Sequence, residues 1–278
     1  MELLRPLVAA GALLLAALPS CHFAAATAAY ANPVAPEKLW DGFNAPTGIA
    51  VHPDGSVYVS NWGGGTVERI APNGTRSTVL KGIASPAGIA IDAEGTMFVS
   101  SYSGDYILRV AQDGTQARVA ENLATPTGVA FASNGRLLVA NRAAGEILSL
   151  DLSNGSRHVV GRGLSLPVGV AEIKDGSVVA SQYGGRVTRI LPDGSMQELG
   201  QSFSRPGVGI LPDGPDAVVV IDNGAALVRR VAFDGRSEVV SEGFEGSAVA
   251  LGRAANGDLL VGAWGAGAVY RVKRPDRD

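Results

Sequence analysis

The sequence predicts an all-β protein, a six-bladed β-propeller of four-stranded blades whose ring is closed by the N-terminal strand. Three observations lead to this prediction. A segment of about 40 residues returns six times, and a period of this length is typical of repeat architectures. Each copy holds short runs of strand-forming residues separated by tight-turn pairs. The last copy lacks its fourth run, and a matching run stands ahead of the first copy.

The six copies are recognised by their first residues, which in the best-preserved copies have the form Pro-x-Gly-Ile/Val-Ala. These starts lie at 46–51, 86–91, 126–131 and 167–172, with weaker copies at 206–210 and 247–251. Four strands in each copy at this period are typical of one propeller blade. Six copies therefore predict six blades.

The second copy shows the elements of one blade in order. Strands are expected at 88–91, 96–100, 106–110 and 117–121. Asp-Gly and Asn-Gly pairs predict hairpin turns in which both residues of the pair take a positive φ. These pairs stand at 54–55, 73–74, 113–114, 134–135, 154–155, 175–176, 193–194, 234–235 and 256–257. After residue 32 no segment has a helical period of apolar residues, so no long helix is expected.

The two ends of the repeat region complement each other. The sixth copy provides strands near 247–251, 258–262 and 268–272 and then reaches a charged tail at 273–278. Residues 37–43 match the fourth strands of other copies, such as 77–83, and are expected to complete the last blade. A closed ring leaves no long unpaired edge. Residues 36–272 are thus predicted to form one propeller, with no room for a second domain.

The repeat as a whole resembles a known family. The start Pro46-Thr47-Gly48-Ile49-Ala50-Val51, the pair Asp54-Gly55 and the run Val57-Tyr58-Val59-Ser60-Asn61 look like the NHL repeat. They are similar also to the repeats of virginiamycin B lyases and of gluconolactonase-like propellers. The resemblance covers roughly 36–272 and implies a six-bladed propeller. It does not imply one function, because propellers include enzymes, receptors and scaffolds.

Residues 1–31 have the pattern of a secretory signal peptide. Arg5 precedes an apolar run at 7–18 that is too short to span a bilayer, and small residues follow it. Cleavage fits after 24–26 or after 29–31, and Cys21 offers an alternative lipoprotein signal from which Pro19 departs. The mature protein is expected to be secreted or periplasmic.

Composition restricts the partners. The formal net charge is -3 with no run of Lys or Arg, which argues against nucleic acid and anionic membranes. No later segment is apolar enough to span a membrane, and the single cysteine permits no internal disulfide. The expected state is a monomer that binds an uncharged small molecule, a glycan, a peptide or an envelope protein.

One repeat position and its neighbour suggest a binding site at the mouth of the channel. At the end of the second strand of each blade a polar residue is often followed by an aromatic one. The pairs are Asn61-Trp62, Ser101-Tyr102, Asn141-Arg142, Gln182-Tyr183, Asp222-Asn223 and Ala263-Trp264. Four of only 16 aromatic residues occupy the second position. We expect a polar ring with an aromatic mouth, or, as the alternative, side chains that fill crevices and close turns.

The residue between Pro and Gly at each repeat start is the second set near the channel. These residues are Thr47, Ala87, Thr127, Val168, Val208 and Ala248. The resemblance to gluconolactonase-like propellers implies Asn and Asp at such positions, which together with a Glu from the first blade hold calcium. Calcium needs several oxygen ligands, including carboxylates. The positions here are apolar or Thr and no matching first-blade Glu is found, so neither a metal nor any other cofactor is predicted.

Catalytic sets of known type are not found in the sequence. His22, His52 and His158 are all expected away from the channel mouth, which argues against a Ser-His-Asp relay and against zinc sites with several histidines. The favoured function is therefore a ligand- or protein-binding module, leaning away from an enzyme. The alternative is a lyase or lactone hydrolase with an atypical site on Asp222 and Arg142, and only this alternative calls for a calcium or magnesium ion. A third possibility is an assembly part of an envelope complex.

Overall fold

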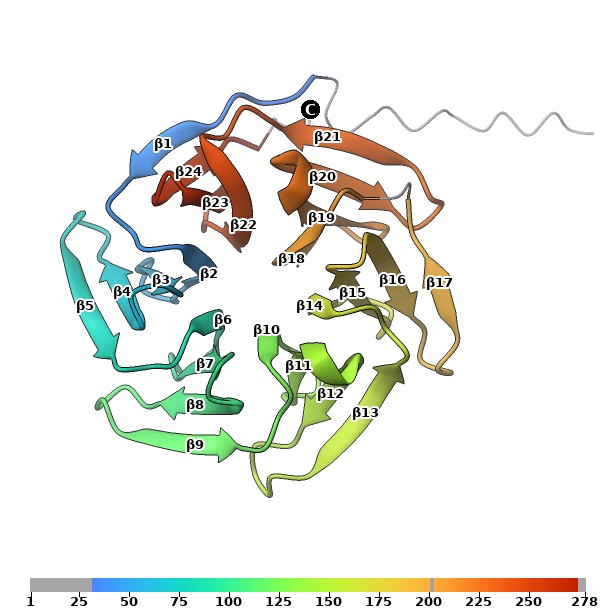
Figure 1. The fold of residues 1–278 in the computed structure, drawn as a ribbon, viewed down its shortest axis with the longest axis horizontal. Coiled ribbons are helices and arrows are strands. Elements are labelled where there is room, and N and C mark those ends of the chain that lie inside the picture. The colour runs from blue at the N-terminus through green and yellow to red at the C-terminus, as the bar shows by residue number, and fades with distance from the viewer. Residues whose placement is uncertain (1–31, 201–202, 275–278) are drawn as a thin grey trace, which may run out of the picture.

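The computed structural model describes residues 32–200 and 203–274, and within them the chain forms a ring of six four-stranded antiparallel sheets (Figure 1). Blade 1 consists of β2 (Pro46–Val51), β3 (Val57–Asn61), β4 (Thr66–Ile70) and β5 (Arg76–Lys81). Blade 2 consists of β6 (Pro86–Ile91), β7 (Met97–Ser101), β8 (Tyr106–Val110) and β9 (Gln116–Ala120). Blade 3 consists of β10 (Pro126–Phe131), β11 (Leu137–Asn141), β12 (Glu146–Leu150) and β13 (Arg157–Arg162).

The second half of the ring repeats this plan. Blade 4 consists of β14 (Pro167–Glu172), β15 (Val178–Gln182), β16 (Arg186–Ile190) and β17 (Met196–Glu198). Blade 5 consists of β18 (Pro206–Pro212), β19 (Ala217–Asp222), β20 (Leu227–Ala232) and β21 (Ser237–Ser241). Blade 6 consists of β22 (Gly246–Arg253), β23 (Leu259–Gly265), β24 (Ala268–Val272) and β1 (Glu37–Trp40). The six-bladed propeller predicted from the repeat is thereby confirmed.

The N-terminal strand closes the ring as predicted. β1 pairs antiparallel with β24, and Glu37 lies opposite Arg271 with an ion pair at 2.5 Å. Beyond the strand, the Phe43 amide donates to the Gly267 carbonyl at 2.9 Å, and the Phe43 side chain is buried. The first and last parts of the repeat region are therefore held together by both hydrogen bonds and apolar packing.

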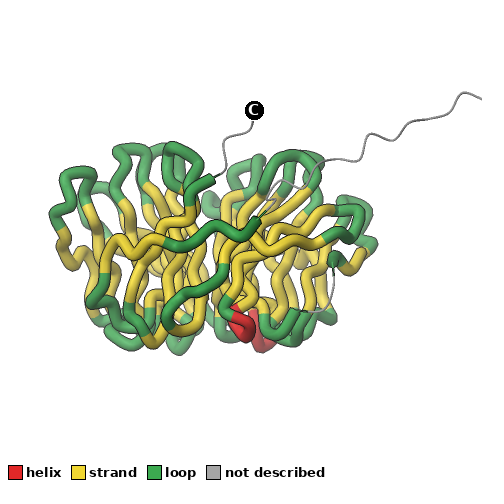
Figure 2. The backbone as a smooth tube through the Cα atoms, turned by 90° about the horizontal axis from the view of Figure 1, so that it is seen from above, coloured by secondary structure: helices red, strands yellow, loops and turns green. Residues whose placement is uncertain are grey.

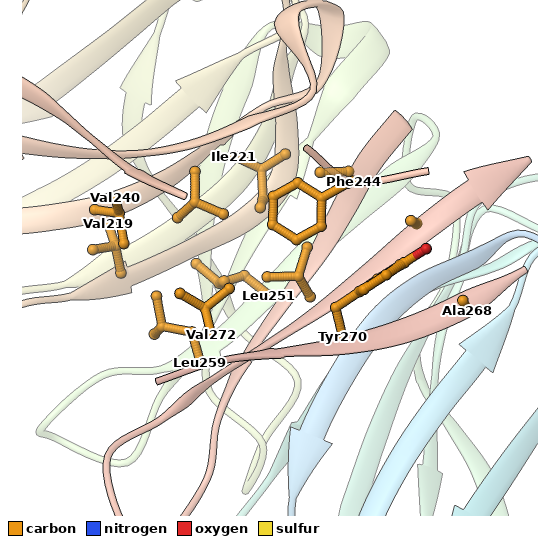
Figure 3. Packing of buried hydrophobic residues seen from close by; sticks show 13 residues of the cluster. Val219, Ile221, Val240, Phe244, Leu251, Leu259, Ala268, Tyr270 and Val272 are labelled. Atoms are coloured by element: carbon orange, nitrogen blue, oxygen red, sulfur yellow. The ribbon is translucent and has the colours of Figure 1, made fainter. Parts of the chain in front are cut away.

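Apolar clusters fill the space between neighbouring blades. In the cluster of Figure 3, Val219, Ile221 and Val240 of blade 5 pack with Leu251 and Leu259 of blade 6. Phe244 meets the ring of Tyr270 edge to face, with centroids 5.5 Å apart. Burial of apolar surface contributes about 25 cal/mol per Å², so the blades stabilise one another through these clusters.

The glycine of each repeat start permits close approach of adjacent inner strands. A Cβ on Gly48 would lie 2.2 Å from the Ala87 carbonyl oxygen of the next blade. Ser60 bridges the same gap, because its Oγ accepts from the Gly48 amide at 2.8 Å and donates to Ala87 at 2.5 Å. Ser100 repeats this arrangement between blades 2 and 3. The repeat motif is thus explained by contacts between blades.

The hairpin turns occur where the Asp-Gly and Asn-Gly pairs predict them, but their geometry differs. The glycines take positive φ, for example +83° at Gly55, whereas none of the preceding Asp or Asn residues does. The Asp54 carboxylate instead accepts the Ser56 amide at 2.8 Å, and the Gly55 amide donates to the His52 carbonyl. The expectation of two positive φ angles is wrong because these loops are longer than two residues and the side chain closes the turn.

Helix is almost absent from the described residues. Two 3-10 turns, η1 (Arg142–Ala144) and η2 (Asn223–Ala225), lie on the same face of the ring (Figure 2). Among the described residues no helix has the length and apolar character needed to cross a membrane.

Candidate functional site

The polar residues that end the second strands are buried and bonded to the protein itself. Asn61 is 1% exposed. Its Oδ1 accepts the Asn44 amide at 3.2 Å, and its Nδ2 donates to Thr66 and Glu68. The side chain therefore connects the loop before β2 to the strands behind it rather than lining the channel.

The equivalent residues of blades 2 to 5 do the same, whereas blade 6 has Ala263 at this position. Each of these side chains bonds a backbone group of the loop that enters its blade. The contacts are Ser101 to the Ala84 carbonyl at 2.8 Å, the Ala124 amide to Asn141 at 2.6 Å, the Ser165 amide to Gln182 at 2.6 Å, and the Ser204 and Arg205 amides to Asp222 at 3.2 and 3.0 Å. Asp222 also lies 3.4 Å from the Nε of Arg229. This geometry agrees with the alternative in which these side chains close turns.

The loops anchored in this way hold the following residue of each pair in place. Ala45, Ser85, Thr125 and Leu166 all have a positive φ between 50° and 55°. Their carbonyl oxygens accept hydrogen bonds from the backbone amides of the second residues of the pairs, for example from Trp62 at 3.1 Å and from Tyr183 at 2.9 Å. We call the residues at one repeat position in the six blades a column, so the first and second residues of the pairs are the first and second columns. Such angles cost about 1–2 kcal/mol for a residue other than glycine, and local strain of this kind often accompanies functional sites.

Five of the second residues of the pairs, together with Arg205, form a continuous chain of side-chain contacts, which we call the collar. In order of contact it comprises Trp264, Trp62, Tyr102, Arg142, Tyr183 and Arg205. The ring of Trp62 lies 4.4 Å from that of Tyr102 and 6.0 Å from that of Trp264. Arg142 donates to the Tyr102 hydroxyl at 3.0 Å and lies over the Tyr183 ring at 5.3 Å. All six blades or their entering loops therefore contribute to one contiguous surface.

Hydrogen bonds to the inner strands fix Trp264, at one end of the collar, and Asn223, which is not part of the collar. Trp264 Nε1 donates to the Thr47 hydroxyl of blade 1 at 3.2 Å, and Asn223 Nδ2 donates to the Ala248 carbonyl of blade 6 at 2.9 Å. Tyr183 is 37% exposed, and Arg205 is exposed as well. The collar is thus a fixed arrangement with part of its surface open to ligands.

Arg205 was not among the residues predicted from the sequence. It lies immediately before Pro206, in the column occupied by Ala45, Ser85, Thr125 and Leu166 in the earlier blades. Its guanidinium lies over the Tyr183 ring at 5.1 Å. A single cation in a column of small or apolar residues is the signal that points to it.

The residues between Pro and Gly offer little to a metal ion. Ala87, Val168 and Ala248 are buried and have no side-chain oxygen. The Thr47 and Thr127 hydroxyls are bonded to backbone carbonyls, at 2.9 Å from Ala45 and 3.2 Å from Ala140. Within residues 32–200 and 203–274, no three side chains of His, Cys, Asp or Glu come together as a metal site.

The aspartates with perturbed pKa values lie on the hairpin turns, away from the collar, and the pKa of Glu245 is lowered by its hydrogen bond with Lys38. The Ser56 backbone hydrogen bond holds the pKa of Asp54 well below its usual range. The pKa values of Asp113, Asp175 and Asp234 are lowered by the same kind of turn hydrogen bond. These shifts result from turn formation and do not mark acid–base chemistry.

The central channel is narrow and mostly apolar. A cavity of about 160 Å³ is lined by the inner strands, including Gly88, Gly128 and Gly209, with Glu172 near its hairpin end. This volume is smaller than the 300–1,000 Å³ typical of small-molecule pockets. The channel therefore offers little room for a ligand of ordinary size.

Comparison with known proteins shows the same fold at low sequence identity. No protein-family model matches the chain, and neither does any curated protein. A virginiamycin B lyase from Staphylococcus aureus is 18% identical with a TM-score of 0.67, covering 86% of this chain and 84% of the lyase. A gluconolactonase from Xanthomonas campestris is 17% identical with a TM-score of 0.74, covering 86% and 89%. The calcium-binding protein regucalcin from Agrobacterium tumefaciens is 15% identical with a TM-score of 0.73, covering 87% and 94%. The chain therefore has the propeller fold of these proteins.

Proposed function

We propose that the protein is an extracytoplasmic binding module that holds its ligand on the collar. The observation that supports this most directly is the unbroken contact of aromatic and cationic side chains from Trp264 to Arg205, to which all six blades or their entering loops contribute. Trp, Tyr and Arg are the residue types most enriched at binding hot spots. The ligand is a small molecule, a glycan or a peptide with a flat apolar face, or such a group on an envelope protein.

The positions of the collar side chains are set before any ligand arrives. Asn61 and Asn141 anchor the loops beneath Trp62 and Arg142, and the Trp62–Tyr102 ring contact restricts both rings. Preorganised side chains lose little conformational entropy on binding, which favours affinity. The buried polar residues thus support the site indirectly.

Tryptophan substitution tests this proposal. Glycan, peptide and metabolite libraries are screened by intrinsic fluorescence, since two of the three tryptophans, Trp62 and Trp264, are in the collar. Trp62→Ala and Trp264→Ala should each weaken a ligand found in this way by about 2 kcal/mol or more, roughly 30-fold. Trp40→Ala, on outer strand β1, is the matched control and should leave affinity unchanged. Unchanged affinity in both collar variants would exclude the collar as the site.

A second candidate is a lyase or lactone hydrolase, as the names of similar structures indicate for those proteins. In favour of it, the Arg142 guanidinium lies in the collar and is suited to stabilising an enolate or carboxylate. A calcium or magnesium ion would belong to this candidate only. Its test is turnover of a panel of lactones and cyclic esters that disappears in Arg142→Ala, with metal content measured on the same preparation.

Export is proposed from residues 1–31, which lie outside the described residues. The mass of the mature protein isolated from its native envelope or medium distinguishes cleavage after 24–26 or 29–31 from lipidation at Cys21. A full-length protein retained in the cytoplasm would contradict export.

A further inference from the structure

We infer that the collar contains a subsite for an acidic group. Arg142 and Arg205 form this subsite, and both contact the ring of Tyr183. This inference rests on the proposed binding function and adds the chemical class of the ligand. The class is a small organic acid with a flat apolar part. It differs from the uncharged ligand that the sequence led us to expect.

The two guanidiniums share one aromatic ring. Arg142 is over the Tyr183 ring at 5.3 Å and Arg205 is over the same ring at 5.1 Å, so the two guanidiniums are separated by no more than the sum of these distances. Two positive charges at one ring favour the binding of an anion beside Tyr183. Arginine also matches carboxylate, sulfate and phosphate groups with two parallel hydrogen bonds.

Neither arginine has a carboxylate partner within the described chain. Several other arginines are paired, as Arg136 is with Asp151 at 3.2 Å and Arg230 with Asp213 at 2.9 Å. The contacts of the Arg142 guanidinium are instead the Tyr102 hydroxyl and the Tyr102 and Tyr183 rings, and that of the Arg205 guanidinium is the Tyr183 ring. Their unused donors remain available to an oxyanion.

Three carboxylates that bond the loops or the strand-end residues behind the collar have partners of their own. Asp222 accepts the Ser204 and Arg205 amides and lies beside Arg229. Glu146 accepts from the Asn141 amide group at 2.9 Å, and Asp105 accepts the Thr125 amide at 2.8 Å. None of the three lies within ion-pair distance of Arg142 or Arg205 in the structure.

The collar is divided into an aromatic and a cationic half. Blades 6, 1 and 2 contribute Trp264, Trp62 and Tyr102, whereas blades 3 and 5 contribute Arg142 and Arg205. The Tyr102 hydroxyl joins the halves through its bond to Arg142. A ligand with a ring and an acid group is therefore expected to bind in one orientation, with its ring against the tryptophans.

Matched acids and neutral esters test the inference. The probes are 2-naphthoate, 2-naphthalenesulfonate and 2-naphthyl phosphate, compared with methyl 2-naphthoate, by titration calorimetry at two salt concentrations. We expect at least one acid to bind about tenfold or more tighter than the ester, with an affinity that falls as salt rises. The three acids distinguish carboxylate, sulfonate and phosphate as the preferred group.

Charge-removing variants assign the preference to the two arginines. Arg142→Gln and Arg205→Gln should each weaken the preferred acid about tenfold and leave the ester unchanged. Arg118→Gln removes an exposed charge on the outer strand β9 and is the matched control. Thermal melts confirm that each variant is folded, and Arg142→Lys shows whether charge alone suffices.

The outcomes separate this inference from the proposed function. Equal binding of acid and ester that is lost in Trp62→Ala overturns the acidic subsite and leaves the collar as a binding site. Binding that is unaffected by Trp62→Ala and by both arginine variants overturns both. No detectable binding of any acid at millimolar concentration also overturns the acidic subsite, while the library screen still decides the binding function.

Discussion

Asp222 provides a decisive test, because the enzyme alternative and the structure assign it different roles. As a catalytic acid or base its removal would abolish turnover with little effect on stability. In the structure it is fully buried, accepts two loop amides and pairs with Arg229, which is itself 21% exposed. Asp222→Ala therefore removes a structural anchor and should lower the free energy of unfolding.

The magnitude follows from these contacts. Breaking a buried ion pair by removing one partner costs about 3–5 kcal/mol, and each amide that loses its acceptor costs about 1–3 kcal/mol if water does not replace it. The contributions overlap, and Arg229 can turn toward solvent, so we expect about 3 kcal/mol. Asp222→Asn keeps the shape and one acceptor and should cost about 2 kcal/mol.

Urea and thermal unfolding followed by tryptophan fluorescence measure this loss. For a domain of this size 1 kcal/mol lowers Tm by roughly 2–4 °C, so Asp222→Ala should melt about 6–12 °C below the wild type. Asp193→Asn, in an exposed hairpin turn that Asn can also close, is the control and should lower Tm by no more than about 2 °C. An Asp222→Ala protein that melts within about 2 °C of the wild type would refute the structural role.

Three further predictions concern the ring itself. Gly128→Ala places a Cβ 2.7 Å from the Val168 carbonyl of the next blade. This overpacking should reduce the free energy of unfolding by about 1–3 kcal/mol, measured as a lower urea midpoint. Phe43→Ala removes a buried ring at the closure and should cost about 3–5 kcal/mol in the same assay, whereas Val79→Ala, 39% exposed, should cost far less. Because the folded-state pKa of Asp54 and of the other turn aspartates is lowered, the unfolded chain binds more protons in acid; the urea midpoint should therefore be flat near neutral pH and fall below about pH 5. A midpoint that rises in acid would contradict that sign.

The sequence predicted the strands well because each repeat contains its own strand-forming runs and turn residues. The expected strands 106–110 and 268–272 coincide with β8 and β24, and the expected closing strand 37–43 contains β1. Strand-forming runs and turn glycines are local signals, so six imperfect copies reinforce one another. The turn type was harder to predict, because it depends on loop length and on which side chain bonds the turn.

The side of the strand that each polar side chain at a strand end faces could not be predicted from the repeat. Successive strand residues face opposite sides, so a shift of one residue decides whether Asn61 or Trp62 faces the loop. The pairing register shifts between Pro46 and Gly48, and such a bulge re-aims the side chains next to it. Arg205 was missed for a related reason, since it reaches the collar from the loop before its blade rather than from a second strand.

Adjacent columns of the repeat thus have separate physical tasks, and this separation explains their composition. In four blades the first column accepts loop amides, through the side-chain amides of Asn61, Asn141 and Gln182 and through Asp222, which has Arg229 beside it. The second column is free of that requirement, because its backbone is already held by the loop carbonyls. Its side chains differ from blade to blade and give the collar an aromatic and a cationic half. Substitutions in the second column should therefore alter ligand choice at little cost in stability, whereas substitutions in the first should do the reverse.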